Sequence, residues 1–390
     1  MKIAYIGKIS FSALIDCGRW ERLTASGGWV VDERGLSRQK WGFNLGSMII
    51  KGLLNRGHEV HIISAEPEEV CGRFRCRIDD EDCCRLTVIF VPESRKTRWM
   101  YLRFFWKEMV GMRRAIKELK PEVCFAQWTY ENAYVGLTSG YPTLVVAHDS
   151  PWNVFKAFLN LQTLIKAIYA TLLVVPKIKQ MTVVSPYIAD EFKKFRRFRH
   201  SNLSVIPNGI EMLRDEIGGM RQNFQSPIPH PPTIVSISQE GRLKNSQALF
   251  GAWNILKPKH PDWRLLVYGQ GMPQGMVSRE ELDRVLREEA DLFVSPSLEE
   301  SFGMVFVEAM RFGVPCIGGE KSGAVPWVIG EGGVVCDVTK PEKLAESIER
   351  VMVDRELQKK LGDGGRQRVR EMFDIEKVVD MYERELLKAK

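Results

Sequence analysis

Short apolar segments alternate with longer amphipathic ones along this chain, and the alternation begins again near its middle. In the first half, strands are predicted at residues 3–6, 59–64, 88–91, 123–126, 143–147 and 182–185, and helices at 43–55, 101–119 and 154–173. In the second half, strands are predicted at 233–238, 264–268, 292–295, 315–318 and 333–336, and helices at 246–256, 279–289, 304–311, 341–353 and 374–388. Short strands bracketed by helices are typical of a parallel, doubly wound sheet. The sequence therefore predicts two α/β halves.

The chain is long enough for two such halves, because 390 residues exceed what one hydrophobic core usually organises. We expect a first domain at residues 1–215 and a second at 228–373, joined by a Gly- and Pro-rich linker around 218–232. The last helix, 374–390, is expected to pack back on the first domain. Open parallel sheets bind ligands at the carboxyl ends of their strands, which predicts a ligand site in a cleft between the halves.

Two glutamates in the second half, Glu300 and Glu308, indicate what kind of ligand this is. The segment around them runs from a buried strand through a turn with Ser, Pro and Gly into a helix that begins near Met304. The start of a helix beside such a turn is a good anion site. Carboxylates would repel a phosphate there unless they point at neutral hydroxyls. The pair therefore indicates a ligand with both groups, such as a nucleotide sugar.

A series of short motifs carries a resemblance to a known family. They are Arg56-Gly-His-Glu-Val60, Val146-Ala-His-Asp149, Val184-Ser-Pro186, Val205-Ile-Pro-Asn-Gly-Ile210, Gly241-Arg-Leu-Lys-Asn245, Tyr268-Gly-Gln-Gly271, and Pro296-Ser-Leu-Glu-Glu-Ser-Phe-Gly303 with Glu308-Ala-Met310. In this order and spacing, the chain resembles retaining glycosyltransferases of the GT-B fold, glycosyltransferase family 4 (glycosyl transferases group 1). The resemblance covers most of the chain and implies two Rossmann-like domains that face each other across a cleft.

The resemblance assigns the donor site to the second half. It implies that Glu308 binds the donor ribose and that Glu300 faces the donor sugar. Arg242 and Lys244 lie in the loop where the family neutralises the diphosphate as its bond to the sugar breaks. The other donor-binding positions that the resemblance implies are Gly42, Gly269, Ser301, Phe302, Gly303, Met304 and Val305.

Structural explanations remain open for several of these residues. A glutamate in a first helical turn favours the helix dipole, which would account for Glu308. A basic turn such as the one with Lys244 is usually just solvated. The resemblance places His148 against the transferred sugar, whereas a lone histidine at a strand end is more often structural. Asp149 either orients this histidine or belongs to the turn.

Two places depart from the family pattern. The family carries adjacent glycines before its first helix, where this chain has Lys40-Trp-Gly42, while Gly27-Gly28 lies upstream in a long connection, 8–40. Connections of this length are usually functional or mobile, and an acceptor lid is one interpretation. The second departure is Trp327, at a position where a glutamate is common.

Cysteine and acidic clusters bear on metal binding. Four of the eight cysteines fall at Cys71, Cys76, Cys83 and Cys84, without the paired spacing of common zinc sites. A loop of reduced thiols is therefore favoured over a metal site or a disulfide. The run Asp80-Glu-Asp82 is interpreted as surface charge. We expect a metal-independent reaction and no cofactor beyond the nucleotide-sugar donor, with a UDP-sugar favoured and a GDP-sugar as the alternative.

The net charge, the basic residues and the apolar runs indicate which classes of partner and which cellular location to expect. A net charge of +7 is modest and no DNA-reading helix is evident, so nucleic acid is not expected as a partner. Basic and aromatic residues interleave at 96–117, which predicts either a solvated helix with a buried aromatic face or docking to an anionic membrane through the first domain. No apolar run reaches the roughly 20 residues that span a bilayer. With no signal-peptide pattern, a cytoplasmic protein is expected, in the second case on the inner face of the cell membrane.

The predicted function is transfer of a sugar from a nucleotide-diphosphate donor to a glycan or lipid-linked acceptor, with retention at the anomeric carbon, in the synthesis of cell-surface polysaccharide or glycolipid. No side chain stands out as a covalent nucleophile, which favours a front-face route. The alternatives are a nucleotide-sugar epimerase of the same fold, a phosphorylase, which normally needs pyridoxal phosphate, and a non-catalytic nucleotide-sugar-binding partner.

Overall fold

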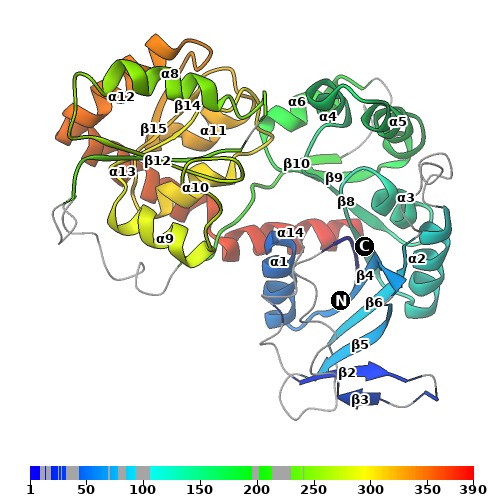
Figure 1. Cartoon of the computed structure of the whole chain (residues 1–390). Coiled ribbons are helices and arrows are strands. Elements are labelled where there is room, and N and C mark those ends of the chain that lie inside the picture. The colour runs from blue at the N-terminus through cyan, green and yellow to red at the C-terminus, as the bar shows by residue number, and fades with distance from the viewer. Residues whose placement is uncertain are drawn as a thin grey trace. The chain divides into compact units, whose positions relative to one another are not determined.

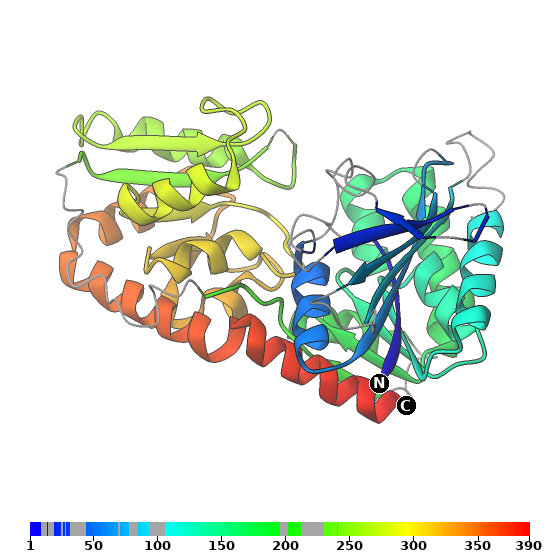
Figure 2. The ribbon, with the colours of Figure 1, turned by 90° about the horizontal axis from the view of Figure 1, so that it is seen from below.

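The computed structural model describes residues 1–8, 14, 19–24, 26–27, 29–31, 44–68, 71–77, 85–93, 106–195, 202–212, 230–239 and 241–390. The chain forms two compact units, which Figures 1 and 2 show from two sides. Unit 1 contains Met1–Val184, Ile188–Ile206 and Ile375–Lys390, and unit 2 contains Ser185–Tyr187 and Pro207–Asp374. The last helix therefore belongs to unit 1. The predicted linker, 218–232, lies almost entirely outside the described residues.

Unit 1 is built on a ten-stranded sheet in the order β10-β9-β8-β7-β1-β4-β6-β5-β2-β3. Its strands are β1 Lys2–Ile6, β2 Arg19–Leu23, β3 Trp29–Val31, β4 Glu59–Glu66, β5 Gly72–Arg77, β6 Leu86–Pro92, β7 Val123–Gln127, β8 Thr143–Ala147, β9 Gln180–Val183 and β10 Asn202–Val205. The pairs from β10 to β6 are parallel, as predicted. The strands β5, β2 and β3 add an antiparallel edge that the prediction missed.

Helices cover both faces of this sheet because its central strands are apolar on both sides. The helices before the second sheet are α1 Asn44–Asn55, α2 Trp106–Leu119, α3 Glu131–Leu137, α4 Pro151–Phe158, α5 Leu161–Tyr169 and α6 Pro186–Lys193, and the chain ends in α14 Ile375–Ala389. Successive residues of a strand point to opposite faces. Ile3 and Tyr5 of β1 accordingly pack with α1 and α14, whereas Ala4 and Ile6 pack with α2 and α3.

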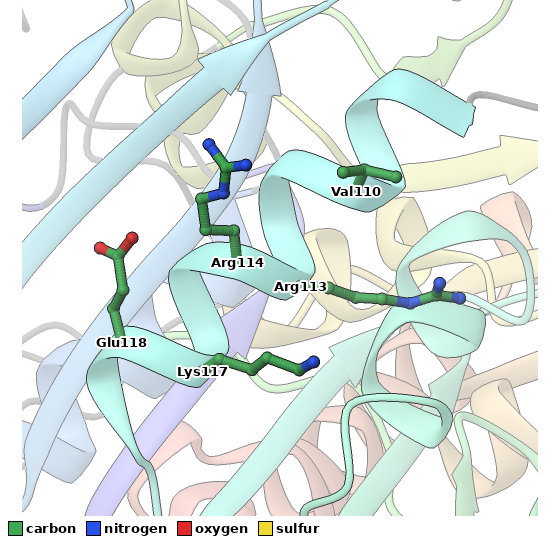
Figure 3. Close-up of a pocket in the computed structure, with 5 residues that line it drawn as sticks. All are labelled: Val110, Arg113, Arg114, Lys117 and Glu118. Atoms are coloured by element: carbon green, nitrogen blue, oxygen red, sulfur yellow. The ribbon is translucent and has the colours of Figure 1, made fainter.

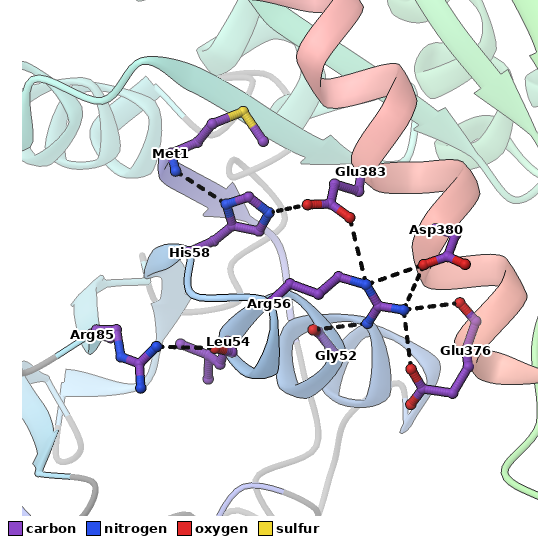
Figure 4. A network of polar contacts seen from close by, with 9 residues as sticks. All are labelled: Met1, Gly52, Leu54, Arg56, His58, Arg85, Glu376, Asp380 and Glu383. Carbon is purple, nitrogen blue, oxygen red and sulfur yellow. Dashed lines mark hydrogen bonds and ion pairs between the residues drawn. The ribbon is translucent and has the colours of Figure 1, made fainter.

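A network of charged residues joins α14 to the end of α1 (Figure 4). The guanidinium of Arg56 lies 2.6 Å from Asp380, 3.0 Å from Glu376 and 3.5 Å from Glu383. Nε2 of His58 lies 2.6 Å from the same Glu383. Burial opposes the charge on Arg56, and the two nearest carboxylates outweigh it, so the pKa of Arg56 is raised. This network and the apolar face of α14 hold the last helix on unit 1.

Two expected loops of unit 1 contain strands. The connection 8–40 includes β2 and β3, so it is wrong to treat it as one long loop. The prediction of a loop for the Cys-rich stretch is also wrong, since β5 runs through it with Phe74 and Cys76 buried. Cys83, Cys84 and the acidic run 80–82 lie outside the described residues.

The predicted helix 154–173 is broken in the structure. The first helix, α4, ends at Phe158, and α5 begins at Leu161 and continues into a π-turn at Ala170–Val174. The break occurs because Leu159 has a left-handed backbone with φ of 47°. No helix in the described part of the chain is long and apolar enough to cross a membrane.

Unit 2 has a five-stranded parallel sheet in the order β12-β11-β13-β14-β15. Its strands are β11 Thr233–Ile237, β12 Arg264–Tyr268, β13 Leu292–Ser295, β14 Cys316–Gly319 and β15 Gly333–Cys336. Its helices are α8 Ser246–Leu256, α9 Arg279–Glu288, α10 Met304–Arg311, α11 Val325–Ile329, α12 Pro341–Val353 and α13 Arg355–Arg368. Ile234, Leu292 and Ile317 pack against α8 and α12 in the main core.

Candidate functional site

The strand order of unit 2 reverses between β11 and β13, and the candidate donor residues lie in the loops that follow these two strands. From β11 the chain moves outward to β12 and then crosses back to β13 on the other side. Ligands of open α/β sheets bind at such a reversal, outside the carboxyl ends of the strands. The backbone N–H of Leu298 donates to the carbonyl of Leu243 at 2.7 Å, which ties the two loops together.

Lys244 and Glu300 form an ion pair across these loops. The Nζ atom of Lys244 donates to Oε1 of Glu300 at 2.6 Å. The carbonyl of Glu300 also accepts from the N–H of Ala324 at 2.9 Å, so a third loop fixes its backbone. Arg242, on the same loop as Lys244, is exposed. The structure thus brings together two residues that the sequence assigned to the diphosphate and to the sugar.

The start of α10 lies beside this pair. Gly303 immediately precedes α10 with φ of 95°, a conformation that favours glycine over residues with a side chain. Phe302 is buried, with its ring edge-on to Trp327 and Phe373 at 6.1 and 5.5 Å between centroids. The carbonyl of Ser301 accepts from Oγ of Ser185 at 2.7 Å. These contacts anchor the turn, so the first amides of α10, at Met304 and Val305, have a fixed position.

Glu308 lies in α10 and is held by a cation from α9. Its Oε1 accepts from Nη1 of Arg279 at 2.6 Å, and the glutamate is 9% exposed. Nε of Arg279 also lies 3.3 Å from Asp283, which pairs with Arg311 at 2.9 Å. Burial opposes the charge on Arg279, but Glu308 and Asp283 outweigh it and raise the pKa of this guanidinium. The ion pair with Arg279 therefore holds the carboxylate of Glu308 in one orientation.

Gly269 follows β12, next to the end of β11. A Cβ on Gly269 would lie 1.7 Å from the carbonyl oxygen of Ser238. Its φ of 135° is also one that residues with side chains rarely adopt. The two backbones can approach this closely only with glycine, so Gly269 shapes the loops around the site.

A second group of polar residues lies at the strand reversal of unit 1, between β1 and β7. Nε2 of His148, after β8, lies 2.8 Å from Oε1 of Gln127 at the end of β7. Burial lowers the pKa of His148 to about 3, so the imidazole is neutral near pH 7. Because a neutral ring has one N–H, a hydrogen bond to the amide oxygen assigns the proton to Nε2.

Trp128 lies beside His148, and Asp149, the next residue in the chain, is hydrogen-bonded to Tyr130. The ring of Trp128 lies 5.0 Å from the imidazole ring, and Trp128 has φ of 61°, which is rare for a bulky side chain. The hydroxyl of Tyr130 donates to Asp149 at 3.2 Å. Burial raises the pKa of Asp149 to about 6, against the opposing effects of Tyr130 and Lys166. Strained backbone conformations such as that of Trp128 are concentrated at functional sites.

Residues 48–213 match Glycosyltransferase Family 4, and residues 221–368 match Glycosyl transferases group 1. Together these two matches cover most of both units and contain every candidate residue named above in loops 238–245 and 296–308. The chain belongs to the family-4, group-1 glycosyltransferases.

Known relatives and solved structures agree with this membership. N-acetyl-alpha-D-glucosaminyl L-malate synthase of Bacillus anthracis is 41% identical over 96 residues, which are 24% of this chain and 25% of that protein. A D-inositol 3-phosphate glycosyltransferase of Streptomyces bingchenggensis is 26% identical over 41% of this chain and 32% of its own length. The first relatives are thus matched over less than half of their own length.

The fold of this chain is GT-B. Sucrose-phosphate synthase from Thermosynechococcus elongatus has a TM-score of 0.68 at 18% identity, over 100% of this chain and 99% of that one. Anabaena HepE, solved with UDP and glucose, has a TM-score of 0.62 at 15% identity, over 98% of each chain. The expected fold, two doubly wound Rossmann-like domains, is confirmed.

One expected site residue cannot be located in the structure, and the sequence analysis did not predict several residues that contact the candidate site. Gly42 lies outside the described residues. Arg279 was missed because it stands 29 residues before Glu308, with no local pattern that links the two. Gln127 and Trp128 were also missed, although the end of an apolar strand beside β1 was a usable signal. Glu300 and Glu308 each contact a cation, which the sequence argument about neutral hydroxyls did not foresee.

Proposed function

We propose that this chain is a retaining, metal-independent glycosyltransferase that moves a sugar from a nucleoside-diphosphate donor to a glycan or lipid-linked acceptor. The observation that carries the proposal is the arrangement after β11 and β13. There the Lys244–Glu300 pair, the start of α10 and the Arg279-bound Glu308 occupy one edge of the unit 2 sheet. A cation, free helix-start amides and an oriented carboxylate suit phosphate and hydroxyl groups on one ligand.

The donor is held from its ribose to its diphosphate in this proposal. Glu308 accepts a hydrogen bond from a ribose hydroxyl, and Arg279 orients the carboxylate. An ammonium group has three N–H donors. Glu300 accepts one from Lys244, and the others serve the diphosphate together with Arg242 and the amides of Met304 and Val305. Gly269, Ser301 and Phe302 act as supports of these loops.

The same groups drive the reaction. As the bond between the anomeric carbon and the phosphate oxygen breaks, its electron pair goes to the diphosphate, and Lys244 and Arg242 stabilise that developing charge. The acceptor oxygen forms its bond to the anomeric carbon on the face that the diphosphate leaves. Its proton passes to the leaving phosphate oxygen. Glu300, paired with Lys244, lies on the sugar side and both positions the cation and contacts sugar hydroxyls.

In unit 1, the proposed roles concern the acceptor and the transferred sugar. His148, neutral and oriented by Gln127, contacts the sugar near its anomeric carbon. An imidazole with a pKa of about 3 does not carry a competing positive charge beside the oxocarbenium-like sugar. The indole of Trp128 provides an apolar face on which a sugar ring of the acceptor can stack.

We propose a UDP-sugar as the donor, with a GDP-sugar as the alternative. Solved complexes of Anabaena HepE contain UDP with glucose and UDP-glucose, which supports the uracil nucleotide by analogy. For the acceptor, we propose a precursor of cell-surface polysaccharide or glycolipid, reached at the inner face of the cell membrane through unit 1. The exposed bases of α2, among them Lys107 and Arg114, support peripheral contact with anionic lipid.

A calorimetric titration with UDP-, GDP- and ADP-glucose tests the donor half of the proposal. We expect one nucleotide sugar to bind, and Glu308→Gln to weaken that binding about tenfold to a hundredfold, since a hydrogen bond to a charged group contributes about 1.5–3 kcal/mol. Glu342→Gln is a matched control, because Glu342 is an exposed first-turn glutamate of α12. Equal donor affinity of wild type and Glu308→Gln would remove the ribose assignment.

A further inference from the structure

Large apolar side chains are concentrated at one exposed place in unit 1, the hairpin of α4 and α5. Phe158, Leu159 and Leu161 form its turn and are 65%, 65% and 71% exposed. The outward side of α5 and the π-turn after it continues this surface with Ile168, Leu172 and Leu173, all exposed. We call the six residues the hairpin patch. Scattered exposed apolar residues are ordinary, but a contiguous group marks an interaction surface.

The turn between α4 and α5 has a leucine at a position whose backbone conformation favours glycine or asparagine. Leu159 adopts a left-handed conformation, with φ of 47° and ψ of 42°. Glycine or asparagine adopts this conformation with little strain, whereas a leucine is destabilised by it. The following residue, Asn160, caps α5 by accepting from the N–H of Thr163 at 2.9 Å. The turn is therefore well formed, and a strained leucine projects from its tip.

The hairpin patch is not needed to fill the core beneath it. The opposite side of α5 and its extension is buried through Ala167, Tyr169, Ala170 and Val174. Nε1 of Trp152 in α4 donates to Oγ1 of Thr171 at 3.0 Å, which fastens the two arms of the hairpin together. The hairpin is thus a rigid support with one face packed on unit 1 and the other face apolar and exposed.

The charged residues of the hairpin and of the segment that follows it are all basic. No aspartate or glutamate occurs from residue 150 to 189, while Lys156, Lys166, Lys177 and Lys179 all lie in this stretch. Of these lysines, Lys156, Lys177 and Lys179 are exposed. An apolar tip with a basic margin is complementary to a bilayer with anionic headgroups, in which the tip enters the acyl boundary and the lysines contact phosphates.

The basic surface continues beyond the hairpin. Tyr169 of α5 lies 5.8 Å from the ring of Tyr134 in α3, and the guanidinium of Arg113 in α2 stands 5.2 Å over that same ring. In Figure 1, α5, α3 and α2 follow one another along unit 1. A hollow of about 450 Å³ lies along α2, and Figure 3 shows the basic side chains that line it. Glu118, the acidic residue among the described residues that line it, is paired with Arg73.

We propose that the hairpin patch inserts into the surface of an anionic lipid bilayer and is the main membrane-docking element of this chain. The bilayer fits better than a second copy of the chain, because the lysine margin would face an identical lysine margin across a two-fold interface. The inference deepens the membrane association proposed above by naming the element that makes it. It does not depend on glycosyl transfer, since none of the hairpin patch residues lies among the donor residues.

Co-sedimentation with vesicles tests the inference. Wild type and the variant Phe158→Ser/Leu159→Ser/Leu161→Ser are compared on vesicles of phosphatidylcholine alone and of equimolar phosphatidylcholine and phosphatidylglycerol. The triple variant removes exposed side chains, so its thermal unfolding should stay close to that of wild type. The matched control is Met276→Ser/Val353→Ser/Leu387→Ser, which removes three exposed apolar residues elsewhere, 77%, 61% and 53% exposed.

We expect wild type and the control to bind the anionic vesicles and to bind phosphatidylcholine much more weakly. Inserting one large apolar side chain contributes about tenfold in affinity, so the triple variant should bind at least a hundredfold more weakly. Equal sedimentation of the triple variant and wild type would overturn the proposal. The proposal would also be overturned if wild type did not bind vesicles and instead formed a dimer that the triple variant does not form. Donor titration of the same samples separates the two proposals, because the triple variant should retain donor affinity.

Discussion

Nζ of Lys244 lies 2.6 Å from Oε1 of Glu300, although 56 residues separate them in the chain. The pair joins the loops after β11 and β13, the two neighbouring strands at which the order of the unit 2 sheet reverses. Both side chains are largely shielded from solvent, with 32% and 16% exposed. The ion pair holds both side chains in place, so the two groups are set side by side before any ligand binds.

Replacing Lys244 by methionine should abolish most of the activity. The substitution keeps the length of the side chain and removes the charge that we propose stabilises the leaving diphosphate. Loss of one such group lowers kcat by about 10²–10³-fold in well-studied enzymes. Release of nucleoside diphosphate from the donor measures the effect. Lys343→Met is the control, because Lys343 forms an ion pair of similar length, 2.8 Å with Glu346, on an exposed helix. A Lys244→Met protein with wild-type kcat would contradict the assignment.

Replacing Arg279 by methionine should weaken donor binding. Glu308 then loses the cation that orients it, and we expect the donor Kd to rise about threefold to thirtyfold, in line with the loss of one charge-assisted contact. Arg284→Met is a matched control on the same helix, since Arg279 and Arg284 are 45% and 44% exposed and each forms ion pairs. Both variants should lose little stability, as partly exposed pairs usually contribute about 1 kcal/mol or less. A donor affinity that changes equally in both variants would count against a role of Arg279 at the site.

Asp149 should make the stability of unit 1 fall as the pH rises from about 4 to about 6. Burial raises its pKa from 3.8 to about 6, so the folded state binds this proton more tightly than the unfolded state does. That stabilisation is fully present below pH 4 and is lost as the pH rises through 6. The lowered pKa of His148 has the opposite effect and makes stability rise with pH. The contribution of Asp149 is therefore measured as the difference between wild type and a variant. In urea unfolding, the stability of Asp149→Asn should rise more steeply, or fall less, than that of wild type between pH 4 and 6, and the exposed Asp190→Asn should follow wild type. Parallel pH curves for wild type and Asp149→Asn would show the prediction to be wrong.

Adding a methyl group at Gly52 should loosen α14 from unit 1. A Cβ there would lie 2.6 Å from a methyl group of Val379, closer than real contacts allow. Overpacking of this kind destabilises by about 1–3 kcal/mol, which urea unfolding of Gly52→Ala measures. Lys51→Ala in the same helix is the control, because Lys51 is exposed. Restoration of stability by the double variant Gly52→Ala/Val379→Ala would identify the clash as the cause.

The regular elements of unit 2 could be predicted from the sequence because each carries a clear local signal. The helices at 246–256 and 341–353 and the strands at 264–268, 292–295 and 333–336 have the same limits in the structure. Each has Pro, Gly, Ser or Asn at or next to at least one end, and the strands are short, largely apolar runs. The helix α13 was missed because its sequence, with glycines at 362, 364 and 365, resembles a loop.

The antiparallel edge of unit 1 could not be predicted because its strands are rich in charged residues and β2 pairs with β5 at long range. Arginines alternate with Phe74 and Cys76 in β5, and charged residues also flank Trp20 in β2, so both segments read as charged loops. These two strands pair with each other although 54 residues separate Arg75 from its partner Glu21. The break at Leu159 had no Gly or Pro to mark it.

The candidate site was predictable where a motif is contiguous and not where tertiary structure assembles it. The segment from Ser301 to Glu308 shows its turn, its glycine and its helix start in one stretch of sequence. The cation that holds Glu308 and the amide that orients His148 come from other elements, and only the fold brings Arg279 and Gln127 to them.

The stereochemistry of the reaction tests the proposed transfer with retention most directly. Proton NMR can follow the anomeric signal of the sugar during turnover of an α-linked nucleotide sugar, with the Lys244→Met protein as the inactive reference. We predict that the first product carries the sugar in the α configuration and that its formation requires Lys244. A first product in the β configuration, or turnover that persists without Lys244, would contradict this mechanism.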